Sequence, residues 1–303
     1  MGAAELAKVR AEHPVEPFYR ALGQRALTRQ GVLWCAAGRF TLITFPNNAR
    51  VAGTRREVQQ LLVDSGRLAA VFCPADGSGP RVKEYSLEAK DYGLDRLQHQ
   101  FRTHVRRHAS RFECRGLDWD EMGTLAAEVN ADTAIRHGIR GRSRAESGRW
   151  TVACRAAAET PGLTAFGCIA GGALAAYVVA WQAGSTCHGV LISRSSRFDA
   201  DRVGNVLMYS FSRAYISRGD VARINLGRSW YPPKPNLDSF KRHAGYEERD
   251  VTVAVVLHPR LESLLRSSWT RRCLIGARVL TGGRVNFDAD LDVIDAARLT
   301  DIP

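Results

Sequence analysis

The feature that most constrains the fold is a regular alternation of short apolar segments and turn residues between residues 162 and 258. Three such segments, at residues 163–169, 173–181 and 187–193, predict consecutive strands, because each is short, apolar and bounded by glycine or polar residues. The pair Gly171-Gly172 predicts a tight hairpin between the first two. Strands joined by such short turns pair antiparallel, so this part of the chain predicts an antiparallel meander.

Helical periodicity then interrupts the strands. Apolar residues recur at helical spacing between about 202 and 218, and Gly219 favours the end of that helix, because glycine takes the left-handed conformation cheaply. The further expected elements are a strand at 222–226, a short helix at 237–243 with Asn236 as N-cap, and a final strand at 252–257. This order predicts an α/β (α+β) fold in which a mixed, mostly antiparallel sheet is flanked by helices.

The N-terminal half shows the same kinds of element less regularly. A strand is expected at 39–45, a helix at 54–65 with Thr54 as N-cap, and a strand at 67–72. The chain has 303 residues, which is long for one domain and comfortable for two.

A basic amphipathic helix is predicted over residues 94–112, where apolar residues recur every three or four positions. Its other faces carry several arginines and a single acid, Asp95. Like charges crowded in this way repel one another unless an anion lies nearby. If that anion is a nucleic acid, its expected contacts are Arg102, Arg106, Arg107 and Arg111. The alternative is an ordinary solvated face.

The formal net charge of +12 favours an anionic partner, which could be a nucleic acid, a phosphorylated cofactor or a membrane surface. A GC-rich genome would explain arginine in place of lysine, but it would not explain the excess over acidic residues. The first thirteen residues lack the apolar stretch of a secretory signal, and glycines interrupt the longest apolar run. We therefore expect a cytoplasmic protein with no membrane span.

The seven cysteines stand singly, and no CxxC or other ligand spacing occurs. We expect buried structural cysteines, no disulfide framework and no metal site. Cys187 and His188 are adjacent within an expected strand, so their side chains should point to opposite faces.

The order of elements resembles the GNAT acyltransferase fold, and its details resemble the FemAB-like branch of that superfamily. The segments that carry the resemblance are the basic helix, the strand pair around 166–177, Asn205 in a helical first turn, and the ending Phe240-Lys241-Arg242-His243-Ala244-Gly245-Tyr246. The resemblance covers roughly residues 85–258. It implies two tandem GNAT-like halves. The boundaries are a degenerate half at 1–115 that includes the basic helix, a transferase half at 116–260, and a helical extension and tail at 261–303.

One departure from the GNAT pattern concerns the acyl donor. GNAT enzymes hold a cofactor pyrophosphate on a glycine-rich loop that precedes a helix. The matching residues here are Arg202, Gly204 and Asn205, so only one glycine remains and the backbone approaches a phosphate less freely. The resemblance therefore implies an aminoacyl-tRNA or an acyl-CoA as donor and co-substrate, with no permanently bound cofactor.

The implied reaction is transfer of an acyl or aminoacyl group to a small-molecule or peptide amine. No Ser-His-Asp signature is seen, so no covalent enzyme intermediate is expected. By resemblance Lys241 meets a donor phosphate or the developing oxyanion. Arg228 is a second catalytic candidate because it follows a strand at a glycine-marked edge, where sites in open sheets tend to lie. Tyr231 is a third, as an acid or a donor to the oxyanion. The substrate-binding candidates are Ser229, Trp230, Tyr209, Arg136 and Arg140. His137 is a histidine placed in a loop where it could titrate near neutral pH.

Each of these residues also has a structural interpretation. Lys241 could be an exposed helix lysine, Tyr209 could pack in the core, and the proline-rich stretch at 230–235 could be a connector. Two other functions stay open as well. One is a non-catalytic nucleic-acid binder that uses the same fold, and the other is a GNAT-type acyltransferase for polysaccharide or cell-wall precursors at an anionic membrane surface.

Overall fold

The first sheet is built mainly by the N-terminal part of the chain. Its strands are β1 (Ala26–Arg29), β2 (Val32–Ala37), β3 (Thr41–Phe45), β4 (Arg50–Val51), β5 (Ala69–Pro74) and β13 (Ala254–Leu257). Their order is β1-β2-β3-β5-β13, and β4 also pairs with β5. The computed structural model describes residues 12–37, 40–88, 91–136, 147–229 and 235–265.

A helix with a strong start signal covers this sheet. In α3 (Arg55–Ser65) the Thr54 side chain accepts a hydrogen bond from the Glu57 N–H, and the Glu57 carboxylate accepts one from the Thr54 N–H. This reciprocal capping satisfies two N–H groups that a helix start otherwise leaves unpaired. The apolar face of α3 is buried against β5 and β13. The predicted helix and its N-cap are confirmed.

The second sheet has the order β12-β6-β11-β10-β9-β8-β7. Its strands are β6 (Arg81–Leu87), β7 (Glu113–Leu117), β8 (Leu163–Ala170), β9 (Ala173–Ala183), β10 (Thr186–Arg194), β11 (Arg223–Arg228) and β12 (Glu247–Thr252). All neighbours in this sheet pair antiparallel except β10 and β11. The mixed, mostly antiparallel sheet flanked by helices that the sequence predicts is confirmed.

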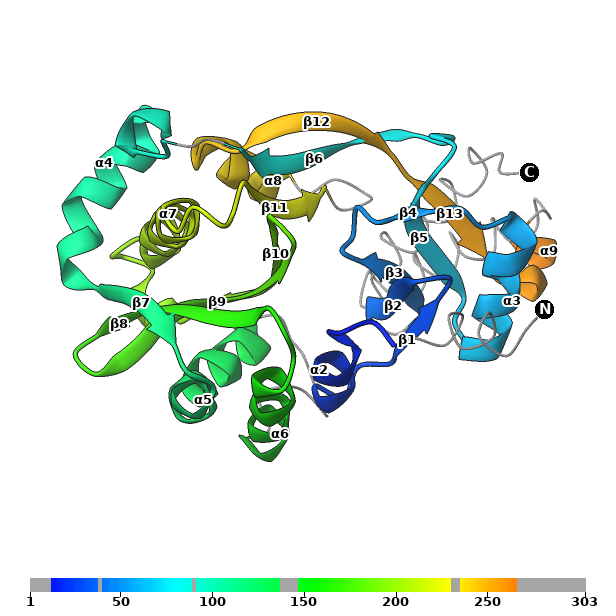
Figure 1. Cartoon of the computed structure of the whole chain (residues 1–303), viewed down its shortest axis with the longest axis horizontal. Helices are drawn as coiled ribbons and strands as arrows, with labels where there is room; N and C mark the ends of the chain where they lie inside the picture. Colours follow the sequence, from blue (N-terminus) through cyan, green and yellow to red (C-terminus); the bar gives the residue numbers. More distant parts are fainter. Residues whose placement is uncertain (1–11, 38–39, 89–90, 137–146, 230–234, 266–303) are drawn as a thin grey trace, which may run out of the picture.

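Helices cover both faces of the second sheet (Figure 1). The helices there are α2 (Glu16–Ala21), α4 (His99–His108), α5 (Trp119–Arg136), α6 (Ser147–Ala158), α7 (Val203–Ile216) and α8 (Pro235–His243). The last helix, α9 (Pro259–Leu265), lies instead beside α3 at the first sheet (Figure 1). One apolar core joins α4 and α7 to the sheet, and another joins α2, α5 and α6 to the opposite face. Because Cys187 belongs to the first core and His188 stacks on Trp181 of the second, their predicted opposite orientation is confirmed.

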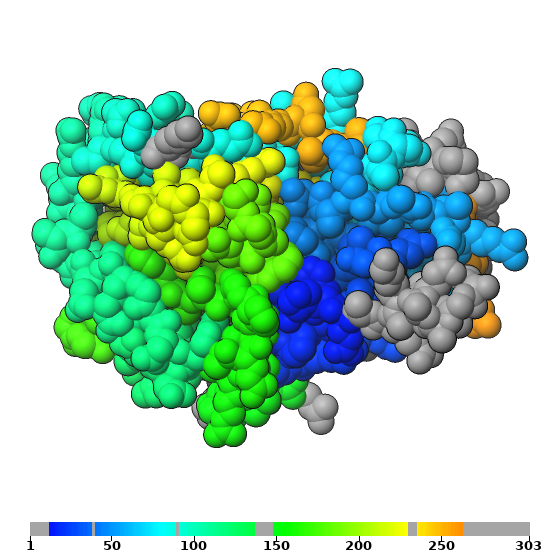
Figure 2. Space-filling model, viewed as in Figure 1, coloured from blue at the N-terminus to red at the C-terminus, as the bar shows by residue number. Residues whose placement is uncertain are grey.

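The two sheets exchange strands across the expected domain boundary at residue 115. β6 precedes that residue and pairs within the second sheet, whereas β13 returns from the C-terminal side to pair with β5. Figure 1 shows β6 and β12 running side by side toward the first sheet, and Figure 2 shows the N-terminal part packed directly against the rest. The boundaries at 115 and 260 stay predictions.

Three expected elements differ from the structure. The basic helix is shorter than predicted, because Leu97 is extended and separates a 3₁₀ turn (Leu94–Arg96) from α4. Asn236 lies inside α8, which begins at Pro235, so it is not the N-cap. The final strand divides into β12 and β13, which join different sheets; the charged sequence of β12 hides its strand character.

The expectation of no disulfide is wrong for one pair of cysteines. Cys114 in β7 and Cys168 in β8 lie opposite each other across an antiparallel pair and form a disulfide. Their separation of 54 residues gives no sequence signal of this pairing. The other cysteines of the described residues, Cys35, Cys73, Cys154 and Cys187, are free and buried, as predicted.

Candidate functional site

Two cavities lie where β10 and β11 stop pairing. The strands pair in parallel for only three residues each, ending at His188 and Asn225. Just beyond, β10 carries a bulge between Gly189 and Leu191, and the register of β11 against β6 also shifts. Backbone groups and side chains past this point face open space instead of a neighbouring strand. Bulges of this kind often re-aim side chains next to functional sites.

The larger cavity has a volume of about 620 Å³ and is bounded by both helical layers. On one side it is lined by α7 and α8, and on the other by the C-terminal end of α5. Its cationic lining residues are Arg136, Arg194, Arg228 and Lys241. Arg136 and Arg194 are each paired with a carboxylate, Asp132 and Asp199 respectively.

The smaller cavity has a volume of about 360 Å³ and lies between the first sheet and the ends of β10 and β11. None of the described residues that line it carries a charge. Burial, followed by the charge of Arg223, lowers the pKa of His188 to about 4, so this imidazole is neutral near pH 7. The two cavities share four lining residues, Asn47, Gly189, Val190 and Leu226.

Lys241 is a buried cation in the wall of the larger cavity. Its side chain is only 6% exposed, and its Nζ donates to the Leu226 carbonyl at 3.2 Å and lies 4.7 Å from the centre of the Tyr85 ring. Burial lowers the pKa of Lys241 to about 8; the Asp238 carboxylate raises it and the Arg228 charge lowers it further. An ammonium has three N–H groups, so Lys241 keeps donor capacity for an anion.

Arg228 joins the two sheets through backbone carbonyls. Its guanidinium donates to the carbonyl oxygens of Asn47 at 3.0 Å, Ser229 at 3.2 Å and Val71 at 3.3 Å. The side chain is 5% exposed, and burial lowers its pKa. Because these carbonyl partners are neutral, Arg228 brings an uncompensated charge to the cavity, and it also holds β5, the turn after β3 and the end of β11 together.

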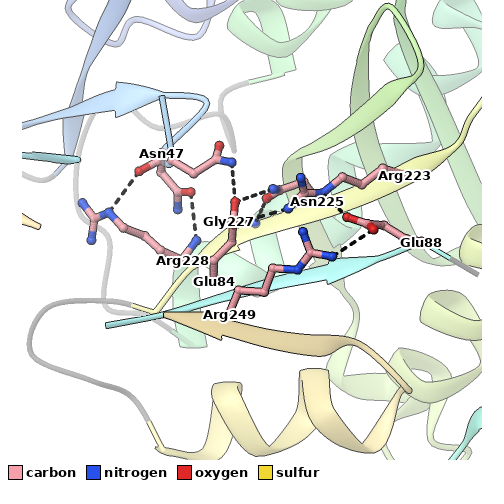
Figure 3. A network of polar contacts seen from close by, with 9 residues as sticks. Asn47, Glu84, Glu88, Arg223, Asn225, Gly227, Arg228 and Arg249 are labelled. Atoms are coloured by element: carbon pink, nitrogen blue, oxygen red, sulfur yellow. Dashed lines mark hydrogen bonds and ion pairs between the residues drawn. The ribbon is translucent and has the colours of Figure 1, made fainter. Parts of the chain in front are cut away.

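A polar network behind the cavities fixes β6, β11 and the turn after β3 (Figure 3). Glu84 of β6 is 6% exposed and accepts hydrogen bonds from Asn225, Arg223 and Asn48. Glu88 pairs with Arg223 and with Arg249 of β12. Because buried charges are stable only when they are paired and hydrogen-bonded, this network specifies where β11 ends.

Replacing Gly227 by alanine should destabilise this junction. Gly227 has φ +74°, and a Cβ built on it would collide with the Asn47 side chain. We expect Gly227→Ala to lower the free energy of unfolding by about 2 to 3 kcal/mol in urea denaturation, because it combines backbone strain with displacement of Asn47. Gly219→Ala is the matched control, since its φ is +79° but open space surrounds it. Equal losses in the two variants would contradict the role of the Asn47 contact.

The N-terminus of α7 reaches the larger cavity through Gly204. The first N–H groups of a helix have no partner inside the helix, and here the N–H groups of Asn205 and Val206 both donate to the carbonyl of Arg202. Arg202 has φ +52°, an uncommon conformation for arginine, and its side chain is exposed. Of the three residues that match the glycine-rich loop, only Gly204 lines the cavity, while Arg202 and Asn205 flank Gly204 in the sequence.

Basic residues continue outward from this helix end. Arg106 and Arg107 of α4 are exposed, and Arg102 is half-buried. Burial lowers the pKa of His104 on α4, and the nearby charge of Arg202 lowers it further, because the two helices bring their cations together. We call Arg106, Arg107 and Arg202 the α4–α7 basic surface. Arg111, by contrast, is paired with Asp201.

The structure brings together only some of the predicted site residues. Lys241, Arg228, Gly204 and Arg136 line one cavity, although they lie on four different elements. Tyr209 packs in the core against Tyr92, with ring centres 5.8 Å apart, and does not line either cavity. Ser229 is 3% exposed, and its N–H donates to the Lys83 carbonyl at 2.6 Å. Trp230, Tyr231, Arg140 and His137 lie outside the described residues.

Asn47 and Ser193 are two of the lining residues that have no place among the sequence predictions. Asn47 lines both cavities, and Ser193, which is 5% exposed, lines the larger one with a buried hydroxyl that has no hydrogen-bond partner among the described residues. The segment Pro46-Asn47-Asn48 has the composition of an ordinary turn. Only its packing against β11 reveals another role.

Metal clusters and membrane-spanning helices are both absent from the described residues. No group of three or more histidine, cysteine, aspartate or glutamate side chains there is arranged to hold a metal ion. Among the described helices, none has both the length and the apolar character needed to cross a membrane.

Comparison with known proteins shows which family and which folds the chain resembles. Residues 96–242 match the family model described as the acetyltransferase (GNAT) domain. No curated protein sequence matches the chain. Among solved structures, FemX has a TM-score of 0.53 at 11% identity, covering 86% of this chain and 97% of FemX. The C-terminal domain of a putative lysylphosphatidylglycerol synthetase from Agrobacterium fabrum has a TM-score of 0.51 at 13% identity, and the match covers 93% of this chain and 97% of that domain.

Both structural likenesses concern the fold, because their identities are low. They extend over both sheets, whereas the family model starts at residue 96 and so omits β1 to β6. Residues 96–242 are therefore similar to the GNAT acetyltransferase domain, and the chain as a whole has a mixed α/β fold like those of FemX and of the synthetase domain.

Proposed function

We propose that the chain transfers an acyl or aminoacyl group from a phosphate-bearing donor to an amine and forms an amide. The donor binds in the larger cavity and the acceptor in the smaller one. The observation that carries this proposal is the separation of charge between two cavities that meet at shared residues. Cations line the larger cavity, and no charged side chain of the described residues lines the smaller one.

The larger cavity suits the donor because aminoacyl-tRNA and acyl-CoA both carry phosphates. The start of α7 reaches the cavity at Gly204, where the positive end of the helix dipole favours an anion, and Lys241 offers an ammonium with remaining donor capacity. The Arg228 guanidinium donates to three neutral backbone carbonyls and forms no ion pair among the described residues, so its charge adds to the positive potential. These groups bind phosphate oxygens or the oxyanion without any covalent enzyme intermediate.

The smaller cavity suits the acceptor because an amine reacts only after it loses its proton. An uncharged, partly apolar site disfavours the ammonium form and so favours the neutral nucleophile. The neutral ring of His188 does not repel an incoming ammonium. In the reaction the C–N bond forms while the bond from the carbonyl carbon to the thiol sulfur or ribose oxygen breaks. The proton lost by the amine ends on that leaving group.

The direct test is a transfer assay with labelled aminoacyl-tRNAs and acyl-CoAs against a panel of amines. We expect transfer that Lys241→Ala abolishes. The control is Lys83→Ala, an exposed lysine of β6 paired with Asp250, which should leave transfer unchanged. Absence of transfer with every donor, or equal activity in the two variants, would reject the proposal or its site.

Salt dependence separates the two donors. If the donor is a tRNA, the α4–α7 basic surface lies where its backbone would continue outward from the cavity. We expect Arg106→Gln with Arg107→Gln to weaken tRNA binding about tenfold near physiological salt and to flatten the slope of log affinity against log salt by about 1.4 to 1.8. Filter binding over a salt series measures both quantities.

The control for this experiment is Arg56→Gln, an exposed arginine of α3 on the first sheet. An unchanged slope in the double variant would favour acyl-CoA as donor. If tRNA binds with a steep salt dependence but no transfer occurs, the result would instead favour a non-catalytic nucleic-acid binder. The exposed arginines of α4 also suit that function.

A further inference from the structure

Asn47 occupies the place where the two cavities meet. It lies in the turn after β3, outside the matched domain at residues 96–242, and it lines both cavities. If donor and acceptor occupy the two cavities, the carbonyl carbon under attack must lie near their shared wall. Asn47 is the residue of that wall with a side-chain hydrogen-bond donor, since its other members are Gly189, Val190 and Leu226.

The orientation of the Asn47 amide follows from its partner. The backbone N–H of Arg228 donates to Asn47 Oδ1 at 3.0 Å (Figure 3). A backbone N–H can only donate, so the atom that receives it is the oxygen, and the NH₂ group must point elsewhere. The Asn47 carbonyl is also fixed, because it accepts from the Arg228 guanidinium at 3.0 Å.

The NH₂ group of Asn47 is available to a substrate. No hydrogen bond among the described residues uses Nδ2, and this atom is not among their buried, unsatisfied side-chain atoms. Gly227 lies directly against the amide, which leaves no room for a different side-chain position on that side. The result is a hydrogen-bond donor held in one orientation before any substrate binds.

We propose that Asn47 Nδ2 donates a hydrogen bond to the oxyanion that develops on the donor carbonyl. This role deepens the proposed function and rests on it. As the amine attacks, the carbonyl π electrons move onto oxygen, and the C=O double bond is restored when the thiol sulfur or ribose oxygen departs. A donor fixed in advance toward that oxygen stabilises the transition state without reorganisation, as side-chain amides do in other acyl-transfer sites.

A purely structural role for Asn47 is the alternative, and Asn48 provides the matched control. Asn48 is the next residue in the same turn and also joins the turn to the second sheet, through its Nδ2 and Glu84. It does not line either cavity. If Asn47 only links the two sheets, its replacement should therefore affect the protein in the same way as replacement of Asn48.

The binding test uses the full chain and two stable donor analogues that keep the carbonyl but cannot release it. These are acetonyl-coenzyme A and a 3′-aminoacylamido-adenosine. We expect one of them to shift the side-chain N–H signals of Asn47 in ¹⁵N NMR spectra and to leave those of Asn48 in place. If an analogue saturates the protein without shifting the Asn47 signals, the oxyanion role is overturned and the proposed function is not. Failure of both analogues to bind at millimolar concentration would overturn the proposed function and this role together.

The kinetic test uses Asn47→Asp, which keeps an oxygen for the Arg228 N–H but replaces the NH₂ donor with a repelling carboxylate oxygen. We expect kcat to fall about 10² to 10³-fold with KM within about threefold, because the hydrogen bond is weak to the bound carbonyl and strengthens as the negative charge develops on its oxygen. Asn48→Ala should keep kcat within about twofold. If Asn47→Ala and Asn48→Ala instead lose activity only in proportion to their stabilities, Asn47 is structural and the proposal fails.

Discussion

Lys241→Met is expected to abolish transfer and, at pH 7, to make the protein more stable. The Nζ of Lys241 is buried, and its pKa of about 8 shows that the folded protein disfavours the charged form. A buried charge replaced by an apolar side chain of similar length removes that cost. We expect the free energy of unfolding to rise by about 1 to 3 kcal/mol. This net gain already subtracts the lost contacts of Lys241 with the Leu226 carbonyl and the Tyr85 ring.

The pH dependence of this difference follows from the direction of the pKa shift. The folded pKa of Lys241 is about 8, below the ordinary value of 10.5, so between these pH values the unfolded chain binds more protons than the folded one. Stability from this group therefore rises with pH in that window. The advantage of Lys241→Met should be greatest below pH 8 and should vanish by about pH 10.5.

Urea denaturation of wild type and Lys241→Met at a series of pH values measures this effect. Lys83→Met is the control, because Lys83 is exposed and paired with Asp250, which raises its pKa instead. A stability difference that does not change between pH 7 and 10.5 would contradict a buried, charged Lys241. A gain in stability together with loss of transfer would indicate that the buried charge is kept for the reaction rather than for the fold.

Arg228→Lys is expected to be strongly destabilising although it keeps the charge. The guanidinium satisfies carbonyls of Asn47, Val71 and Ser229 in three directions, and a single ammonium on a flexible stem cannot reach all three. Buried carbonyls left without a partner cost about 1 to 3 kcal/mol each. We expect the free energy of unfolding to fall by about 3 kcal/mol.

The matched control for this prediction is Arg249→Lys on β12. Arg249 is about half exposed and pairs with Glu88 at 2.9 Å, so its replacement should change stability little. Urea denaturation of both variants gives the comparison. Similar losses in Arg228→Lys and Arg249→Lys would contradict the joining role of Arg228.

Arg228 marks the limit of what local sequence can predict about a site residue. Its place after a glycine-marked strand predicts a catalytic role, and the structure puts it in the cavity wall with its donors held by carbonyls. Two of those carbonyls belong to Val71 and Asn47, which lie 157 and 181 residues away along the chain. Hydrogen bonds to backbone carbonyls also leave no trace in the identity of the residues that supply them.

The residues that line the candidate cavity also divide into those that the sequence predicts and those that only the structure reveals. Arg136 follows from a local pattern, the basic run that begins there, whereas Gly204 and Lys241 follow from the resemblance of their segments to the family. Asn47 has no such signal, because in the sequence it belongs to a turn like many others. Its place in the wall of both cavities depends on the end of β11 packing beside this turn.

The sequence by itself determined the periodic elements: the meander from β8 to β10, the capped helix α3, the apolar stripe of α7 and the basic character of α4. These follow from local spacing of apolar, capping and turn residues, which acts within a few positions along the chain. The tertiary structure alone decided that β13 returns to the first sheet, that Cys114 meets Cys168, and that Asn47 stands between two cavities. These features depend on pairing between distant segments, where burial and hydrogen bonding across the whole fold, and not local preference, select the partners.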